Sequence, residues 1–173
     1  MQSYDNISRK LHWLIGFIII ALIIVGFIME SMAKSPTRGI IYNLHKSFGV
    51  TILCLMIFRI IWKLNHTHPK LPNTIPRWQQ IAAHITHGFL YLIGILMPLS
   101  GLLMSVSHGH PPNIFGLFIL NFPNHWIKPY ANFFSSSHSF LAWLFSLLII
   151  MHIGAAFSHG INKNGIIWRM WKK

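Results

Sequence analysis

Histidines inside apolar segments are the residues of this sequence that could do chemistry. The segment SSSHSFLAWLFSLLIIMHIGAAFSHG at 135–160 contains His138, His152 and His159. An imidazole in hydrocarbon is costly, and ionisable residues within membrane spans are usually functional. His138 and His152 are 14 residues apart, which is four helical turns, so both lie on one face about 21 Å apart along the axis. This spacing predicts two centres at different depths of a membrane.

Other apolar segments supply partners for these two histidines at matching depths. His45 begins the second segment on the same side as His138, so this pair predicts an outer centre. Depth alone leaves three inner partners open for His152: His12, His84 and His87. Histidine pairs from facing helices suit the two axial positions of haem iron. We therefore expect two haems b bound by such pairs.

A zinc or copper centre is the alternative reading of these histidines. Zinc takes about four converging ligands, often cysteine or carboxylate. The apolar segments contain no Asp or Glu, and the one cysteine, Cys54, lies alone in the second segment. We read Cys54 as a small apolar filler. Any single histidine is also explained by a hydrogen bond between helices, but a depth-matched set favours haem.

Four apolar segments must position the histidines. Only 9% of residues are charged and the mean hydropathy is +0.52, both unusual for a soluble protein. The segments reach the roughly 20 residues that cross a bilayer, at about 11–29, 40–62, 81–105 and 139–161. Because backbone groups in lipid must be satisfied internally, each is expected to be a helix. The sequence predicts one all-α domain over residues 1–173, a transmembrane four-helix up-down bundle whose first span is retained rather than cleaved.

The basic residues are distributed unevenly about these segments. Ten of the 14 Lys and Arg residues lie in the N-terminal tail, the 59–80 region and the C-terminal tail. The other four are Lys34, Arg38, Lys46 and Lys128. This bias places both termini in the cytoplasm of a multi-pass protein of the bacterial inner membrane. It also accounts for the net charge of +12 without nucleic acid as a partner.

The connection at about 106–137 is the longest and is expected to face outward. Its middle, IFGLFILNF at 114–122, is apolar but too short to span. We expect a short helix on the membrane surface or a lid over the bundle. A loop of this length is often functional, although simple connectivity would also explain it.

Four stretches of the chain resemble the bacterial cytochrome b561 family. They are KLHW at 10–13, LHKSFGVTILCLMIFRIIWKL at 44–64, AHITHGFLYLIGILMPLSGLLMS at 83–105 and MHIGAAFSHG at 151–160. The family is similar in plan to the cytochrome b subunits of nickel–iron hydrogenases and formate dehydrogenases. The resemblance implies two haems b, the outer one held by His45 and His138 and the inner one by His12 and His152. His87 stays the alternative inner ligand, and the role of His84 stays open.

Polar residues at the inner level extend this interpretation. Arg59 lies 14 residues after His45, on roughly the same face. It would either pair with a haem propionate or extend to the interface. His159 lies seven residues beyond His152, where its pKa range suits proton exchange with a quinone. With Ser8, Arg9 and Trp13 it forms a candidate quinone site, the alternative being an ordinary interfacial histidine.

Four basic residues outside the membrane suggest which electron donor would reach the outer haem. Lys34, Arg38, Lys46 and Lys128, with Glu30 as the acidic residue nearby, would steer a small anion to the outer haem, or would simply lie near lipid headgroups. Some members of the family oxidise superoxide outside and reduce ubiquinone, so the resemblance implies lipid, superoxide and quinone as partners. The alternative is a haem subunit between a partner dehydrogenase or carrier protein and the quinone pool. The third is a non-redox metal-binding membrane protein.

Overall fold

Four long helices make up most of the protein in the computed structural model, which describes residues 3–67, 69, 75–161 and 169–171. The helices are α1 (Asn6–Ser31), α2 (Pro36–Asn65), α3 (Arg77–Ser107) and α4 (Ala131–Ile161). Each contains one of the predicted spans, and all four are long and apolar enough to cross a membrane. The predicted all-α transmembrane bundle is confirmed.

Local sequence explains where the first helices begin. Asp5 caps α1, its carboxylate accepting the backbone N–H of Ser8 at 2.9 Å. Ser35 caps α2, where its hydroxyl accepts the N–H of Arg38 at 3.2 Å. Pro36 then occupies the first turn of α2, a position where its missing N–H costs nothing. The caps fix the starts of the two helices that carry His12 and His45.

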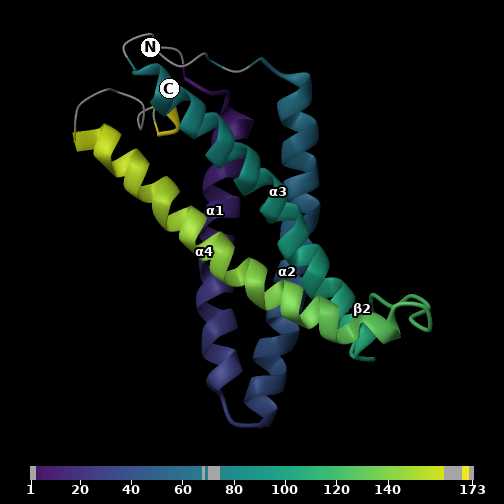
Figure 1. Cartoon of the computed structure of the whole chain (residues 1–173). Coiled ribbons are helices and arrows are strands. Elements are labelled where there is room, and N and C mark those ends of the chain that lie inside the picture. Colours follow the sequence, from purple (N-terminus) through teal and green to yellow (C-terminus); the bar gives the residue numbers. More distant parts are fainter. Residues whose placement is uncertain (1–2, 68, 70–74, 162–168, 172–173) are drawn as a thin grey trace.

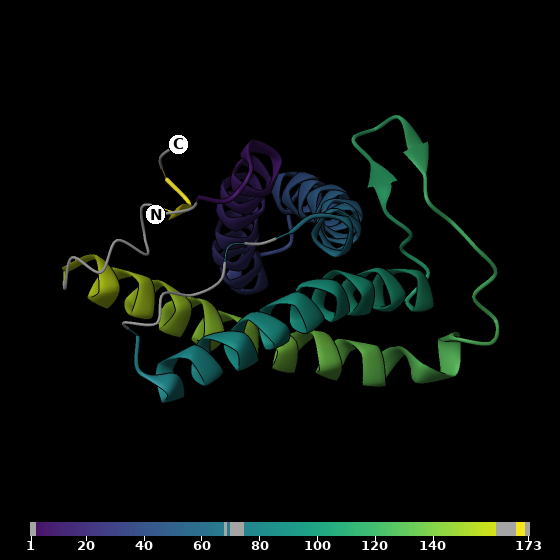
Figure 2. The same cartoon turned by 90° about the horizontal axis from the view of Figure 1, so that it is seen from above.

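The four helices form two crossing pairs. In Figure 1, α1 and α2 make an antiparallel hairpin, and α4 crosses it at a steep tilt. Figure 2 shows α1 and α2 nearly end-on, while α3 and α4 lie across the view side by side. Helices adjacent in sequence pack on each other throughout, and their directions alternate. The up-down order is as predicted, but the second pair lies obliquely across the first.

The core lies where the two pairs cross. Met56 of α2 approaches α3 so closely that a Cβ on Gly94 would lie 2.5 Å from the methionine methyl carbon. Small residues permit such approaches between membrane helices. The buried core residues come from all four helices: Leu11, Ile15, Ile19, Ile52, Met56, Ile93 and Phe145.

The long connection between α3 and α4 contains a β-hairpin, so the prediction of a short helix is wrong. Strand β1 (Asn113–Ile114) pairs antiparallel with β2 (Phe118–Ile119). Phe115 and Gly116 have φ of 50° and 78°, the left-handed pair that turns a tight hairpin. A 3₁₀ helix, η1 (Lys128–Tyr130), precedes α4. The left-handed turn at Phe115 and Gly116, not the apolar composition, sets this local structure.

The start of α1 meets the described C-terminal residues at one end of the molecule. The backbone N–H of Tyr4 donates to the carbonyl of Arg169 at 3.2 Å. The indole N–H of Trp13 donates to the carbonyl of Met170 at 2.9 Å, and the Trp13 ring meets the Trp171 ring edge-on at 5.0 Å. We call this the inner end and the end with the α1–α2 turn the outer end. That the inner end faces the cytoplasm stays a prediction.

Candidate haem sites

His138 on α4 and His45 on α2 form the outer pair. They lie within electrostatic range of each other, and both are half-buried. The Nδ1 atom of His138 lies 3.2 Å from the carbonyl oxygen of Met97 and 3.1 Å from the hydroxyl of Ser100. Since a carbonyl only accepts, Nδ1 of His138 carries the proton. Its Nε2 lone pair is then free, which is the arrangement of a metal-bound histidine.

Glycines on the neighbouring helices leave room for the outer histidines. A Cβ on Gly101 of α3 would lie 2.7 Å from Cε1 of His138, and a Cβ on Gly26 of α1 would lie 3.4 Å from Cε1 of His45. Within the described residues, Nδ1 of His45 is buried without a hydrogen-bond partner. Buried polar atoms are usually paired. A glycine cradle, an unpaired imidazole nitrogen and a free Nε2 together fit a haem.

Three histidines converge at the inner level. The ring centroids of His12 and His152 are 6.1 Å apart, and those of His87 and His152 are 5.4 Å apart. Two imidazoles on opposite sides of one metal, with bonds of about 2.0 Å, have ring centres roughly 6 Å apart. His12 and His152 are half-buried whereas His87 is exposed. Both distances are close to this spacing and do not decide between His12 and His87, so the His12–His152 pair stays a prediction.

His84 lies near His87 on α3 but is bonded within its own helix. Its Nδ1 lies 2.7 Å from the carbonyl of Gln80 within α3, and the residue is exposed. In the part of the chain that the structure describes, no three His, Cys, Asp or Glu side chains form a metal-binding group. The histidines are therefore arranged as two levels rather than as one cluster.

Arg59 lies against the inner histidines. Its guanidinium lies 3.1 Å from Nδ1 of His12 and donates through Nε to the hydroxyl of Tyr91 at 3.2 Å. A guanidinium only donates, so Nδ1 of His12 accepts and the proton of His12 is on Nε2. Iron binding through Nε2 would require the opposite tautomer, so Arg59 would have to release His12. In this structure Arg59 turns toward His12 and Tyr91, and its role toward a haem stays a prediction.

Residues of the predicted quinone site lie at the inner end, but most of their polar groups are engaged. The hydroxyl of Ser8 donates to Asp5 at 2.6 Å, and Arg9 donates to Asn6 at 2.5 Å. The indole N–H of Trp13 is bonded to Met170, so it is not available to a quinone. Nε of Arg9 is buried without a partner among the described residues. His159 belongs to the last turns of α4, and its side chain lies outside the described residues.

Asp5 and Tyr91 contribute to the inner end and were not among the predicted site residues. Besides capping α1, Asp5 accepts the indole N–H of Trp62 at 3.2 Å. Burial disfavours its charged form, but hydrogen bonds from Ser8 and Trp62 outweigh burial and hold the pKa of Asp5 below its usual value. The D-x-x-S pattern at a helix start could have identified the cap. No sequence signal marks Tyr91 as the partner of Arg59.

Two of the four outer cations are bonded into the fold. Arg38 donates to the carbonyl of Met29 at 3.2 Å and to the hydroxyl of Tyr42 at 3.1 Å, so it caps the end of α1. Lys46 donates to the carbonyl of His110 at 2.9 Å. Lys34 and Lys128 are exposed. The structure does not gather all four cations as free charges.

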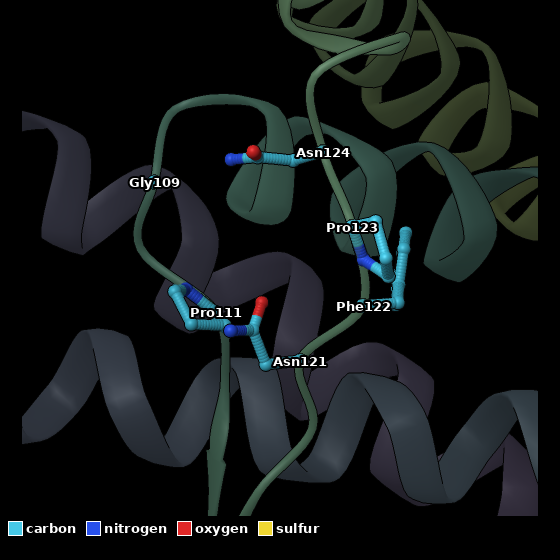
Figure 3. Close-up of a pocket in the computed structure, with 6 residues that line it drawn as sticks. All are labelled: Gly109, Pro111, Asn121, Phe122, Pro123 and Asn124. Atoms are coloured by element: carbon cyan, nitrogen blue, oxygen red, sulfur yellow. The ribbon is translucent and has the colours of Figure 1, made fainter.

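A pocket lies within the connection between α3 and α4 (Figure 3). It is an open pocket between the two arms of this loop, and its lining contains no histidine. Its lining residues are Gly109, Pro111, Asn121, Phe122, Pro123 and Asn124. The pocket is thus separate from the histidine levels.

Helices that can span a membrane and carry paired half-buried histidines at two levels define the class of the membrane-bound b-type cytochromes. The chain matches the model of the prokaryotic cytochrome b561 family over residues 3–173, and it belongs to this family. The protein is therefore a multi-pass bacterial membrane protein of an electron-transfer family, in which haem b is the cofactor.

Curated relatives extend over nearly the whole chain. Cytochrome b561 homolog 2 of Escherichia coli (strain K12) is 29% identical, covering 99% of this chain and 93% of the relative. Cytochrome b561 homolog 1 of the same organism is also 29% identical, covering 98% and 97%. Probable superoxide oxidase CybB of Yersinia pestis is 26% identical, covering 99% and 97%.

Proposed function

We propose that this protein is a di-haem b oxidoreductase of the bacterial inner membrane that oxidises superoxide outside and reduces ubiquinone near the cytoplasmic face. The observation that carries the proposal is the pair of histidine levels on α4, at His138 and His152, each with a partner from another helix. Levels about 21 Å apart along one helix would connect the two sides of the membrane. The whole chain, residues 1–173, acts as one domain with both termini in the cytoplasm.

Four histidines would hold the two haems in this proposal. His45 and His138 are the outer axial ligands, and His12 and His152 are the inner ones. When bound, haem b supplies a one-electron carrier. The chain's own contribution is orientation: Met97 and Ser100 fix the ring of His138, and Arg59, which also donates to Tyr91, contacts His12. Arg59 would turn from His12 to a haem propionate.

Superoxide is the electron donor that the outer end favours. Lys34 and Lys128 are exposed there, and cations on one face attract a small anion and speed its arrival. Arg38 and Lys46 add positive charge from fixed positions. Two superoxide anions would each give one electron and leave as dioxygen. The name of the Yersinia pestis relative supports this donor.

The inner end would complete the reaction at ubiquinone. One quinone takes two electrons and two protons to become quinol. His159 would hydrogen-bond a quinone carbonyl and exchange its proton, since histidine titrates near neutral pH. Arg9 offers a buried, unpartnered Nε, and Ser8 and Trp13 would supply packing around the ring.

The second candidate is a haem subunit that passes electrons between a partner protein and quinone. The observation in its favour is that Arg38 and Lys46 donate hydrogen bonds to backbone carbonyls of the protein, so they keep their charge but are less available for direct contact with an anion. Stopped-flow mixing of the purified protein with superoxide and a soluble ubiquinone analogue separates the two. Salt-sensitive haem reduction by superoxide supports the first candidate, and no reduction without a partner supports the second.

A spectrum and one variant test the rest of the proposal. Dithionite-reduced minus oxidised spectra of the purified protein should have a b-type α-band, and a haem assay should give two haems per chain. Lack of the band would end both redox candidates and leave the non-redox metal-binding protein.

His159→Ala should slow quinone reduction with both haem spectra intact. His84→Ala, an exposed histidine of α3, is the control and should leave the rate unchanged.

A further inference from the structure

The β-hairpin at 113–119 carries an exposed apolar tip. The exposed fractions are 44% for Phe115, 81% for Leu117, 56% for Phe118 and 61% for Ile119. The sequence contains no charged residue from 111 to 127. Single exposed apolar side chains are ordinary, but a contiguous group of them marks an interaction surface. The question is what covers this tip.

The base of the hairpin is fixed to α2. The fully buried hydroxyl of Ser47 accepts the N–H of Phe115 at 3.1 Å and lies 3.1 Å from the carbonyl of Asn113. The side-chain oxygen of Asn43 accepts the N–H of Asn113 at 3.3 Å. The rings of Phe48 and Phe115 meet edge-on at 5.1 Å. These contacts hold the hairpin at one depth along α2.

That depth lies within the span of α2. Ser47 comes 11 residues after Pro36, the first residue of α2, which is about 16 Å along the helix. Figure 1 shows the α1–α2 turn extending beyond the level of the hairpin. Figure 2 shows the hairpin pointing sideways, away from the helices. The tip therefore lies beside the bundle rather than above it.

We infer that the hairpin is an interfacial anchor whose tip enters the outer leaflet of the membrane, below the lipid headgroups. The exposed aromatic residues Trp126, Tyr130 and Phe133 continue its surface along the chain to the start of α4, and such residues are typical of the membrane interface. A two-stranded hairpin leaves backbone groups on its edges that the hydrocarbon centre would not satisfy. The backbone of the hairpin thus lies at the interface, where water reaches these groups, and only the apolar side chains of the tip extend below the headgroups.

Spin-label accessibility tests this inference. Because Cys54 is the one cysteine, the Cys54→Ala protein provides the background for Leu117→Cys labelled with a nitroxide. The haem-loaded protein is placed in vesicles of phosphatidylethanolamine and phosphatidylglycerol. Collisions are measured with oxygen, which concentrates in lipid, and with a nickel chelate, which stays in water. Two matched labels set the limits: Lys34→Cys at the α1–α2 turn and Ile150→Cys, a 68% exposed residue of α4.

The label at Leu117 should collide with nickel several-fold less often than the label at Lys34. Its ratio of oxygen to nickel collisions should lie between the two reference values, nearer that of Ile150. Nickel collisions equal to those of Lys34→Cys would overturn the inference and leave the tip as a surface for a protein partner. Ile119→Cys repeats the measurement if Leu117→Cys does not fold. An unchanged haem spectrum is the check on folding, so the result does not depend on the proposed donor or quinone.

Discussion

The two histidine levels hold their rings in opposite ways. At the outer level, the Nδ1–H of His138 donates a hydrogen bond shared between the carbonyl of Met97 and the hydroxyl of Ser100. At the inner level, Nδ1 of His12 accepts a hydrogen bond from the guanidinium of Arg59. The same residue type is therefore set as two different tautomers. At the outer level, Nε2 of His138 is already unprotonated and could bind a metal. At the inner level, His12 would first have to lose its hydrogen bond to Arg59 and change tautomer.

Charge also differs between the two levels. Two cations contact Tyr91 at the inner level: Arg59 donates to its hydroxyl, and Nζ of Lys63 lies 4.2 Å from the centre of its ring. Nearby cations favour the reduced, less positive form of a haem. A hydrogen-bond acceptor on Nδ1, the ring nitrogen that does not bind iron, makes a histidine a stronger ligand for oxidised iron, as at His138. Both effects predict a higher reduction potential at the inner level, so electrons would move downhill from outside to inside.

Removal of an axial histidine should have the largest effect. His138→Ala should lose the outer haem and His152→Ala the inner one, because each leaves iron with one protein ligand. The haem content per chain, measured as the pyridine haemochrome, should fall by half in each variant. His12→Ala should behave as His152→Ala does, and His87→Ala should keep both haems. Loss of a haem in His87→Ala but not in His12→Ala would reverse the assignment of the inner ligand.

Gly101→Ala should disturb the outer level alone. The added methyl group would lie 2.7 Å from His138, and such overpacking costs about 1–3 kcal/mol. We expect reduced haem content or an altered outer-haem spectrum with a normal inner haem. Gly49→Ala is the matched control, because a Cβ there meets nothing within 4 Å. Equal effects of the two variants would show that His138 does not need the glycine.

Arg59→Gln should lower the inner potential and leave the outer one in place. The loss of one nearby charge is worth about 1–2 kcal/mol at an intermediate dielectric, which is roughly 40–90 mV for one electron. A spectroscopic redox titration of the two haems measures this. Arg59→Lys keeps the charge and should retain most of the potential. A shift of the outer haem instead would contradict the placement of Arg59.

Ser100→Ala should have a smaller effect than Arg59→Gln, and this effect should be on the reduction potential of the outer haem. It removes one of the two acceptors of His138 and leaves Met97. A neutral hydrogen bond contributes about 0.5–1 kcal/mol, so we expect the outer potential to rise by roughly 20–40 mV. The same redox titration applies, and Ser146→Ala on α4 is the control, since Ser146 donates to Ala142 of its own helix. An unchanged outer potential would indicate that the carbonyl of Met97 alone is a sufficient hydrogen-bond acceptor for His138.

Asp5→Ala should have the smallest effect, a loss of stability at the start of α1, the helix that carries His12. Loss of an N-cap destabilises a helix by about 1 kcal/mol, whereas Asp5→Asn keeps a capping oxygen. Because the folded pKa of Asp5 lies below its ordinary 3.8, its charge stabilises the fold above that value, and this is lost as the pH falls through the folded pKa. Thermal unfolding at neutral and acidic pH measures both effects. A larger stability loss from Asp5→Asn than from Asp5→Ala would contradict the cap.

The helices and their histidines could be predicted from the sequence, because both follow from local rules. About 20 apolar residues must form a helix in lipid, and the 14-residue spacing of His138 and His152 fixes a shared face. The hairpin at 113–119 was missed, because an apolar run alone does not reveal the left-handed backbone at Phe115 and Gly116. The positive outer surface was only partly right. A sequence does not show that Arg38 and Lys46 donate to backbone carbonyls.

The sequence by itself determined a membrane bundle with histidines at two depths, since composition and helical periodicity act within each segment. Only the tertiary structure decided which groups face each ring. The carbonyl of Met97, the missing side chain of Gly101 and the turn of Arg59 toward His12 depend on how the α3–α4 pair crosses α1 and α2. Contacts between segments far apart in sequence set the tautomer and charge around each histidine, and no local pattern encodes them.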